Sequence, residues 1–340
     1  MNKHLYSLDY LRGFAAVSVC LFHFSDKLDY LPVGDIFKTI FSPGHFGVEI
    51  FFIISGFVIP YSMDKGHYDL SKIFVFLKKR FIRIEPPYLL CVLLAMFLNY
   101  ATTLSPVYVG KPFNVDYEQL FYHIGYLNAI NGKDWLNPVF WTLAIEFQYY
   151  LLIALFFPLI SHKNRLVWII SLIAFNALAT LFDRNYVFNF SIFFTTGILL
   201  YRYLVGKLNG AETIISAVLV VCFLIYFYSY KELIVTILTS AVVLLPLRPT
   251  TVATFLGNIS YSLYLLHFPI GLRVINLTQR FSDNVSIRQM MVFGALLISI
   301  FCAYYYYKLI EKPFKIKSQR VRYEAKETPE PESVKGKSPW

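Results

Sequence analysis

Long apolar stretches alternate with short polar connections from one end of the chain to the other. Each stretch has the roughly 17 to 25 residues that a helix needs to cross the hydrocarbon core of a bilayer. A helix satisfies its own backbone hydrogen bonds in lipid, and no strand-like alternation competes with this pattern. The chain is therefore predicted to be an all-α polytopic membrane protein of about ten transmembrane helices. The predicted spans are 8–26, 46–63, 86–104, 139–161, 165–183, 186–205, 211–229, 232–248, 254–277 and 287–309.

Composition agrees with a membrane protein. Of the 340 residues, 57% are hydrophobic and only 15% are charged, and the mean hydropathy is +0.54. These values exclude an ordinary soluble domain. The last residues are different, because 318–340 are rich in proline and charge and poor in hydrophobic residues. We expect a transmembrane domain over 1–317 and a disordered cytoplasmic tail over 318–340.

The distribution of basic residues predicts the orientation. The connection 64–85 carries six basic residues against three acids, whereas 104–138 carries two against three. By the positive-inside rule the first connection faces the cytoplasm and the second faces outward. With ten spans, both termini are then cytoplasmic. Arg273, Arg280 and Arg288 surround an outward connection and are exceptions to the rule.

The first span, "LDYLRGFAAVSVCLFHF", contains three ionisable residues. At 100° per residue, Arg12 and His23 fall on nearly the same face of a helix, with Asp9 within about 60° of both. Asp9 and Arg12 can pair, whereas His23 lies about 16 Å further along the axis. Ionisable groups inside a membrane usually face a cavity and mark function. The alternative is that each side chain reaches a membrane interface from its end of the span.

A buried carboxylate is also expected in the fourth span, "VFWTLAIEFQYYLL". Glu146 lies about seven residues into this span, on a face with Trp141, Tyr149 and Tyr150, and it needs a partner. Arg12 is one candidate; alternatively, Glu146 orients His23 or forms a structural ion pair. His267, in "GNISYSLYLLHF", is expected to be buried, and a core histidine is the simpler interpretation.

Basic residues also cluster at the cytoplasmic end of the third span, in "FLKKRFIRIEPPYLL". Arg80 and Arg83 lie one helical turn apart, and Lys79 is adjacent. Such a cluster binds either anionic lipid headgroups or the phosphates of a nucleotide-like ligand. The four cysteines show no spacing typical of metal ligands, and we expect no metal site.

Several stretches resemble the acyltransferase-3 family of integral membrane acyltransferases. They are "LDYLRGFAAVSVCLFHF", "FGVEIFFIISGFVI", the Arg-x-x-Arg of "KRFIRIEPPYLL", "FWTLAIEFQYYLL", "GNISYSLYLLHFPI" and "EKPF", in the family's order over residues 8–314. Departures are mild: Tyr10 replaces the usual glycine, Glu49 a common aspartate and Thr142 a common serine. None removes an implied catalytic group.

The resemblance implies transfer of an acyl group, most often acetyl, from a cytoplasmic coenzyme A thioester to a hydroxyl of a glycan or other acceptor across the membrane. It implies that Arg80 and Arg83 bind the coenzyme and that the histidine of the first span, His23, is the catalytic base. An imidazole with a pKa near 6.5 suits this role, either in direct transfer or through an acyl-histidine.

From this resemblance we expect acetyl-CoA as donor, a cell-surface polysaccharide or glycolipid sugar as acceptor, a bacterial inner membrane location and no nucleic acid partner. Arg12 would line the path of the coenzyme arm, and Asp9 or Glu146 would set the local charge. Lys79 would support coenzyme binding, and Trp141, Tyr149, Tyr264 and His267 would contact substrate. The competing hypothesis is a transporter or flippase that uses the same ionisable residues as a substrate or proton path.

Overall fold

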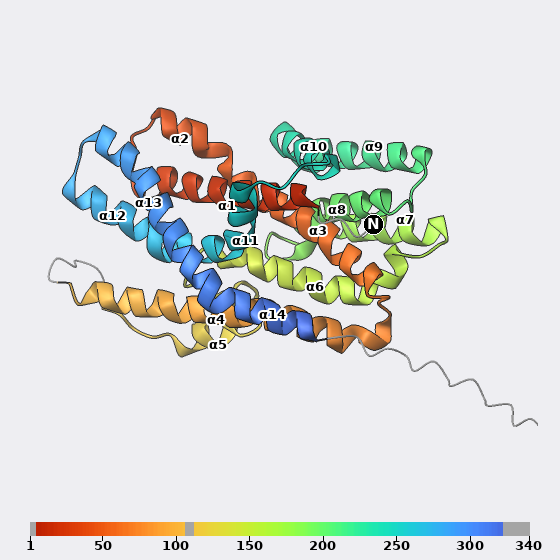
Figure 1. Ribbon diagram of the computed structural model, residues 1–340, viewed down its shortest axis with the longest axis horizontal. Coiled ribbons are helices and arrows are strands. Elements are labelled where there is room, and N and C mark those ends of the chain that lie inside the picture. The colour runs from red at the N-terminus through yellow and green to blue at the C-terminus, as the bar shows by residue number, and fades with distance from the viewer. Residues whose placement is uncertain (1–4, 106–111, 322–340) are drawn as a thin grey trace, which may run out of the picture.

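A computed structural model describes residues 5–105 and 112–321. These residues form helices and connections and contain no strand. Most of the long helices lie side by side along the long axis of the molecule (Figure 1). The described residues therefore confirm the predicted fold class, an all-α polytopic membrane protein.

The α-helices are α1 (Tyr6–Asp26), α2 (Ile36–Phe41), α3 (Gly47–Lys65), α4 (Ile73–Thr103), α5 (Tyr117–His123), α6 (Phe140–Ile160), α7 (Arg165–Ala177), α8 (Ser191–Leu204), α9 (Gly210–Phe227), α10 (Tyr230–Leu244), α11 (Thr251–Leu266), α12 (Leu272–Phe281), α13 (Val285–Tyr306) and α14 (Lys312–Arg320). Two π-helical turns, His267–Gly271 and Tyr307–Glu311, connect α11 to α12 and α13 to α14.

Every predicted span coincides with a helix, but the described residues give six helices that are long and apolar enough to cross a membrane. These are Ile36–Lys65, Leu70–Thr103, Phe140–Ile160, Val187–Leu204, Gly210–Phe227 and Val285–Arg320. The total of ten spans therefore stays a prediction. Helix α14 continues to Arg320, and residues 322–340 of the predicted tail lie outside the described residues.

Helix α4 differs most from its predicted bounds. It begins at Ile73, thirteen residues before the predicted start at 86, and passes through Pro86 and Pro87 without ending. The basic residues at its start lower the hydropathy but do not interrupt the helix. Because of the early start, Arg80 and Arg83 lie well inside α4, one helical turn apart as expected.

Helix α1 occupies the interior of the bundle and packs against α3, α10, α11 and α13. Small residues bring it close to α11: a Cβ added to Gly13 would lie 2.7 Å from Cβ of Leu256, and one added to Gly257 would lie 2.8 Å from Cα of Asp9. In contrast, α9 buries only Ser216 and Leu224. Its remaining apolar surface suits contact with lipid, whereas α1 faces protein on most sides.

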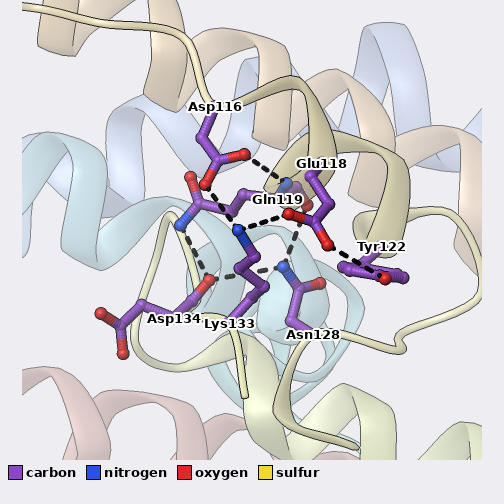
Figure 2. Close-up of polar contacts among 7 residues, drawn as sticks. All are labelled: Asp116, Glu118, Gln119, Tyr122, Asn128, Lys133 and Asp134. Carbon is purple, nitrogen blue, oxygen red and sulfur yellow. Dashed lines mark hydrogen bonds and ion pairs between the residues drawn. The ribbon is translucent and has the colours of Figure 1, made fainter. Parts of the chain in front are cut away.

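A polar network organises the described part of the connection between α4 and α6, which contains α5 (Figure 2). The ammonium of Lys133 lies 3.1 Å from Oδ2 of Asp116 and 2.7 Å from Oε2 of Glu118. Nε2 of Gln119 donates to the carbonyl of Asp134 at 2.8 Å, and Nδ2 of Asn128 donates to the carbonyl of Gln119 at 3.0 Å. These contacts tie the start of α5 to residues 128–134.

Candidate active site

A cavity of about 400 Å³ opens between α1, α3, α4, α6, α11 and α14. Four cations and three carboxylates line it: Arg12, Arg80, Arg83, Lys315, Asp9, Glu146 and Glu311. Its volume falls in the range typical of small-molecule sites, about 300 to 1,000 Å³. Six of the predicted site residues, the five charged ones and Tyr264, come from four different helices and share one polar cavity with a surplus of positive charge.

Hydroxyl groups hold the Glu146 carboxylate in this cavity. Ser55 of α3 donates to its Oε1 at 2.8 Å, and Tyr150, one turn further along α6, donates to the same oxygen at 2.5 Å. The guanidinium of Arg80 lies over the ring of Tyr150, 5.6 Å from its centroid. Glu146 is thus oriented by two hydroxyls within the cavity, and these contacts do not involve His23.

The C-terminal helices supply the opposite wall. Oγ of Ser262 donates to Oε2 of Glu311 at 2.5 Å, and Nζ of Lys315 donates to Oδ1 of Asn258 at 3.5 Å. The hydroxyl of Tyr261 donates to the carbonyl of Ile84 at 3.0 Å. These bonds join α11 to α4 and to the segment that ends in α14, and so fix the distance across the cavity.

Thr142 and Tyr264 line the side of the cavity nearest the histidines, and their hydroxyls are 2.7 Å apart. Beyond Tyr264 lies His267, which is fully buried, and its Nδ1 is 2.7 Å from the Tyr264 carbonyl. The ring of His267 stacks on that of His23, with centroids 5.3 Å apart. His23 does not line the main cavity. It lies two side chains beyond this side of the cavity, near the C-terminal end of α1.

Hydrogen bonding sets the tautomer of His267. A carbonyl can only accept, so Nδ1 carries the proton in the neutral ring and Nε2 carries the lone pair. Within the described residues, Nε2 of His267 and Nδ1 of His23 are buried and have no hydrogen-bond partner. Two imidazole nitrogens are therefore not used in hydrogen bonds within the described part of the chain.

Besides His23 and His267, three more of the predicted residues do not line the main cavity. Lys79 does not line it, and its carbonyl accepts from Oγ of Ser318 at 2.7 Å. Tyr149 stacks on Phe194 with ring centroids 4.1 Å apart. Trp141 lines a separate pocket of about 230 Å³ with Trp135, Arg184 and Asn185, among others.

Several cavity residues were not predicted as site residues. Ser55, Asn258 and Glu311 lie in stretches that carry the family resemblance, so the sequence held a signal for them. Tyr150 follows Tyr149 on the same predicted helix. Lys315 had no such signal, because its place in the cavity depends on how the C-terminal helix packs against α4.

Comparison with known proteins identifies the family of the chain. The sequence profile of the acyltransferase-3 family, described as an acyltransferase domain, matches residues 5–308. The chain therefore belongs to this family of acyltransferases. No solved structure matches the chain significantly.

Curated relatives share parts of the chain. The O-acetyltransferase OatA of Staphylococcus aureus is 24% identical over 321 residues, which covers 79% of this chain and 51% of the relative. A putative acetyltransferase, ORF330, of Acidianus two-tailed virus is 34% identical over 145 residues, covering 43% and 38%. The acyltransferase MdmB of Streptomyces mycarofaciens is 27% identical over 166 residues, covering 48% and 42%. The chain spans about half the length of OatA and less than half the length of each of the other two relatives.

Proposed function

We propose that the protein is a membrane-bound O-acyltransferase that moves an acetyl group from cytoplasmic acetyl-CoA to a hydroxyl of a cell-surface polysaccharide or glycolipid sugar. The observation that carries the proposal is the charged cavity that runs from Arg80 and Arg83 to Tyr264, next to the buried pair His267 and His23. The names of the relatives, O-acetyltransferase and acyltransferase, support acyl transfer.

The donor end of the site is assigned to the cations. Arg80 and Arg83 would bind the phosphates of coenzyme A, since guanidinium groups form charge-assisted hydrogen bonds with phosphate oxygens. Arg12 would line the path of the pantetheine arm, and Lys315 adds a cation that the sequence did not suggest. Lys79, outside the cavity lining, would act at the cytoplasmic mouth. The three carboxylates, Asp9, Glu146 and Glu311, would keep the empty cavity close to neutral and position the cations.

His23 is assigned as the general base. In direct transfer its imidazole takes the proton of the acceptor hydroxyl while that oxygen bonds to the thioester carbonyl carbon, and coenzyme A leaves as a thiolate. The same ring would attack the thioester first in a double displacement. In either route His267 would hold the ring of His23 by stacking, with its own orientation fixed by the Tyr264 carbonyl.

The proposed placement in the membrane has ten spans, both termini in the cytoplasm and a bacterial inner membrane. It is supported by the position of both described ends of the chain. One cavity is lined by Asp9 near the start of α1, by Arg80 in the first third of α4 and by Lys315 in α14. The start of α1 and helix α14 therefore lie at the same end of the bundle, which is what an even number of spans requires.

Binding of acetyl-CoA by the purified chain tests the donor assignment. We expect saturable binding, and we expect the double variant Arg80→Ala and Arg83→Ala to weaken it at least about 100-fold, because two charged contacts are lost. The double variant Lys65→Ala and Lys163→Ala removes the same charge away from the cavity and should bind like wild type. Absence of saturable binding, or equal binding by both double variants, would refute the donor assignment and favour a transporter that uses the same charged path.

A further inference from the structure

A second pocket, of about 190 Å³, lies near the outer end of α4, where α4 meets the segment around Asn137 and α12. Its polar lining comes from Asn99, Asn137, Arg273 and Asn276, and Phe268 contributes an aromatic wall. No carboxylate is among the residues that line it. The pocket therefore combines amides, which suit sugar hydroxyls, with one guanidinium.

This pocket adjoins the histidine pair. Phe268 lines the pocket and also packs edge-on against His23, with ring centroids 4.9 Å apart, and against His267 at 5.5 Å. Nδ2 of Asn137 donates to the carbonyl of Leu265 at 3.2 Å, which fixes this wall to the residue two before His267. One aromatic side chain thus contacts both the pocket and the proposed base. The main cavity approaches the same pair through Tyr264, whose carbonyl accepts from Nδ1 of His267.

Arg273 carries the positive charge of this pocket, and its hydrogen-bond partners do not neutralise that charge. Its two terminal nitrogens donate to neutral oxygens, Oγ1 of Thr102 at 3.2 Å and Oδ1 of Asn99 at 2.8 Å. Its Nε is buried without a hydrogen-bond partner among the described residues. Arg288, another basic residue near this connection, instead pairs with Asp283 at 2.7 Å. A half-buried cation with neutral neighbours only is costly unless an anion binds there.

A second cation stands beside the pocket. Arg280 lies seven residues after Arg273, nearly on the same face of α12. Its Nε donates to Oδ1 of Asn276, a lining residue, at 3.2 Å. The segment from His267 to Phe281 contains no acidic residue. The local charge is therefore positive in spite of the outward position, where the positive-inside rule disfavours arginine.

We infer that this pocket binds the acceptor and that it selects acceptors bearing an anionic group, a carboxylate or a phosphate, next to sugar hydroxyls. Arg273 binds the anion through the terminal N–H groups that its bonds to Thr102 and Asn99 leave free, the amides of Asn99, Asn137 and Asn276 bind hydroxyls, and Phe268 lies between the acceptor and His23. This inference rests on the proposed function for the identity of the ligand as acceptor. The anionic headgroup of a phospholipid shares the same chemistry, and the test below separates the two sources.

The test measures binding, so that it does not depend on turnover. The full chain is placed in nanodiscs of phosphatidylcholine and titrated with a glucuronate-containing hyaluronan tetrasaccharide and with the same tetrasaccharide after reduction of its carboxylates to alcohols. We expect the acidic sugar to bind at least about tenfold more tightly, the size of one charge-assisted hydrogen bond. We expect Arg273→Gln to remove this preference. Asn276 is exposed, so folding should be preserved in Asn276→Asp. This variant places a carboxylate in the pocket and should also remove the preference for the acidic sugar.

Arg184→Gln is the matched control. Arg184 is exposed, lies after α7 and lines the pocket that contains Trp141, so its loss changes charge on the same side but at the other pocket. The preference should survive in this variant. Equal binding of the two sugars, no saturable binding of either, a preference that persists in Arg273→Gln, or a preference lost in Arg184→Gln would overturn the inference.

Two further measurements distinguish a failure of this inference from a failure of the proposed function. Nanodiscs containing phosphatidylglycerol at constant ionic strength should leave the sugar affinity unchanged within about twofold, and displacement of the sugar by this lipid would overturn the acceptor assignment. Acetyl-CoA binding is measured in the same preparation. Acetyl-CoA binding without sugar selectivity refutes this inference alone, whereas sugar selectivity without acetyl-CoA binding refutes the proposed transfer and leaves the anion site established.

Discussion

The imidazole rings of His23 and His267 stack with their centroids 5.3 Å apart and their planes inclined by 25°. His23 belongs to α1, and His267 begins the π-helical turn that follows α11. The two helices approach closely at Gly13 and Gly257, so the stack is held by the packing of the bundle as well as by the rings. The proposed base therefore has a partner whose tautomer is set by a backbone carbonyl.

Replacement of His267 tests its role as a positioning residue. His267→Phe keeps an aromatic ring but loses the donor to the Tyr264 carbonyl, so we expect kcat for acyl transfer to fall at least about tenfold with little change in acetyl-CoA affinity. His267→Asn keeps an N–H donor near the position of Nδ1 and should retain more activity. Equal activity in the two variants would show that the anchor to Tyr264 is unimportant.

The hydroxyl of Tyr150 is expected to matter more than that of its neighbour Tyr149. Tyr150→Phe removes one of two donors to the Glu146 carboxylate and should lower the free energy of unfolding by about 1 to 3 kcal/mol. Acetyl-CoA binding should also weaken, since Glu146 is then freer to pair with the cations. Tyr149→Phe is the control, because the Tyr149 hydroxyl is buried with no partner among the described residues. A larger effect for Tyr149→Phe in thermal unfolding would contradict this reading of the site.

The connection between α4 and α6 should lose stability in mild acid. His123 of α5 is buried, and burial lowers its pKa to about 4. Leu136 N–H donates to its Nε2 at 3.4 Å, so Nδ1 carries the proton and donates to the hydroxyl of Tyr88 at 2.6 Å. The folded state thus binds a proton less readily than the unfolded state, whose histidine pKa is near 6.5. The free energy of unfolding is unaffected above pH 6.5. It falls as the pH decreases from about 6.5 to about 4, by up to about 3 kcal/mol.

Hydrogen exchange of residues 116–136 across this pH range measures the effect. We expect exchange to accelerate as the pH falls, after correction for the intrinsic pH dependence. His123→Gln should flatten the dependence, whereas His162→Gln, at an exposed position, should not. An unchanged pH profile in His123→Gln would show that another group is responsible.

Lys133 is expected to hold α5 in place through the contacts of Figure 2. A hydrogen bond from the backbone of Gln119 and the nearby Lys133 ammonium lower the pKa of Asp116, and Lys133 lowers that of Glu118. Lys133→Ala should therefore speed hydrogen exchange in Tyr117–His123. Because these charges are exposed, the difference from wild type should shrink at high salt. A difference that is independent of salt would mean that the lysine acts by packing.

The sequence predicted the helical architecture well because hydropathy reports directly on contact with lipid. It placed a helix at each predicted span, but it missed the early start of α4, where the cations of the donor site interrupt the apolar run and the helix continues. It also read 254–277 as one span, whereas a π-helical turn at His267–Gly271 lies within it. Such a turn depends on local backbone hydrogen bonds that hydropathy does not encode.

The candidate site was predicted in part. Asp9, Arg12 and Glu146 were predicted to face a polar interior, and they line the cavity together. The sequence could not show that Ser55 orients Glu146, or that Lys315 reaches the same space, since these contacts join segments far apart in the chain. The bond from Tyr150 to Glu146 is local, because the two residues lie four positions apart on α6. Helical periodicity placed His23 on the face of Arg12, but His23 lies beyond Tyr264 and does not line the cavity.

The most direct test of the central claim, that His23 performs acyl transfer beyond the Tyr264 side of the donor cavity, is the O-acetyl content of surface glycans measured by mass spectrometry. Cells lacking the gene are complemented with wild type, His23→Ala or His162→Ala at equal protein levels. We predict that wild type and His162→Ala add O-acetyl groups and that His23→Ala adds less than about 1% as many, while its membranes bind acetyl-CoA as tightly as wild type. Glycan acetylation by His23→Ala at the wild-type level would contradict the account.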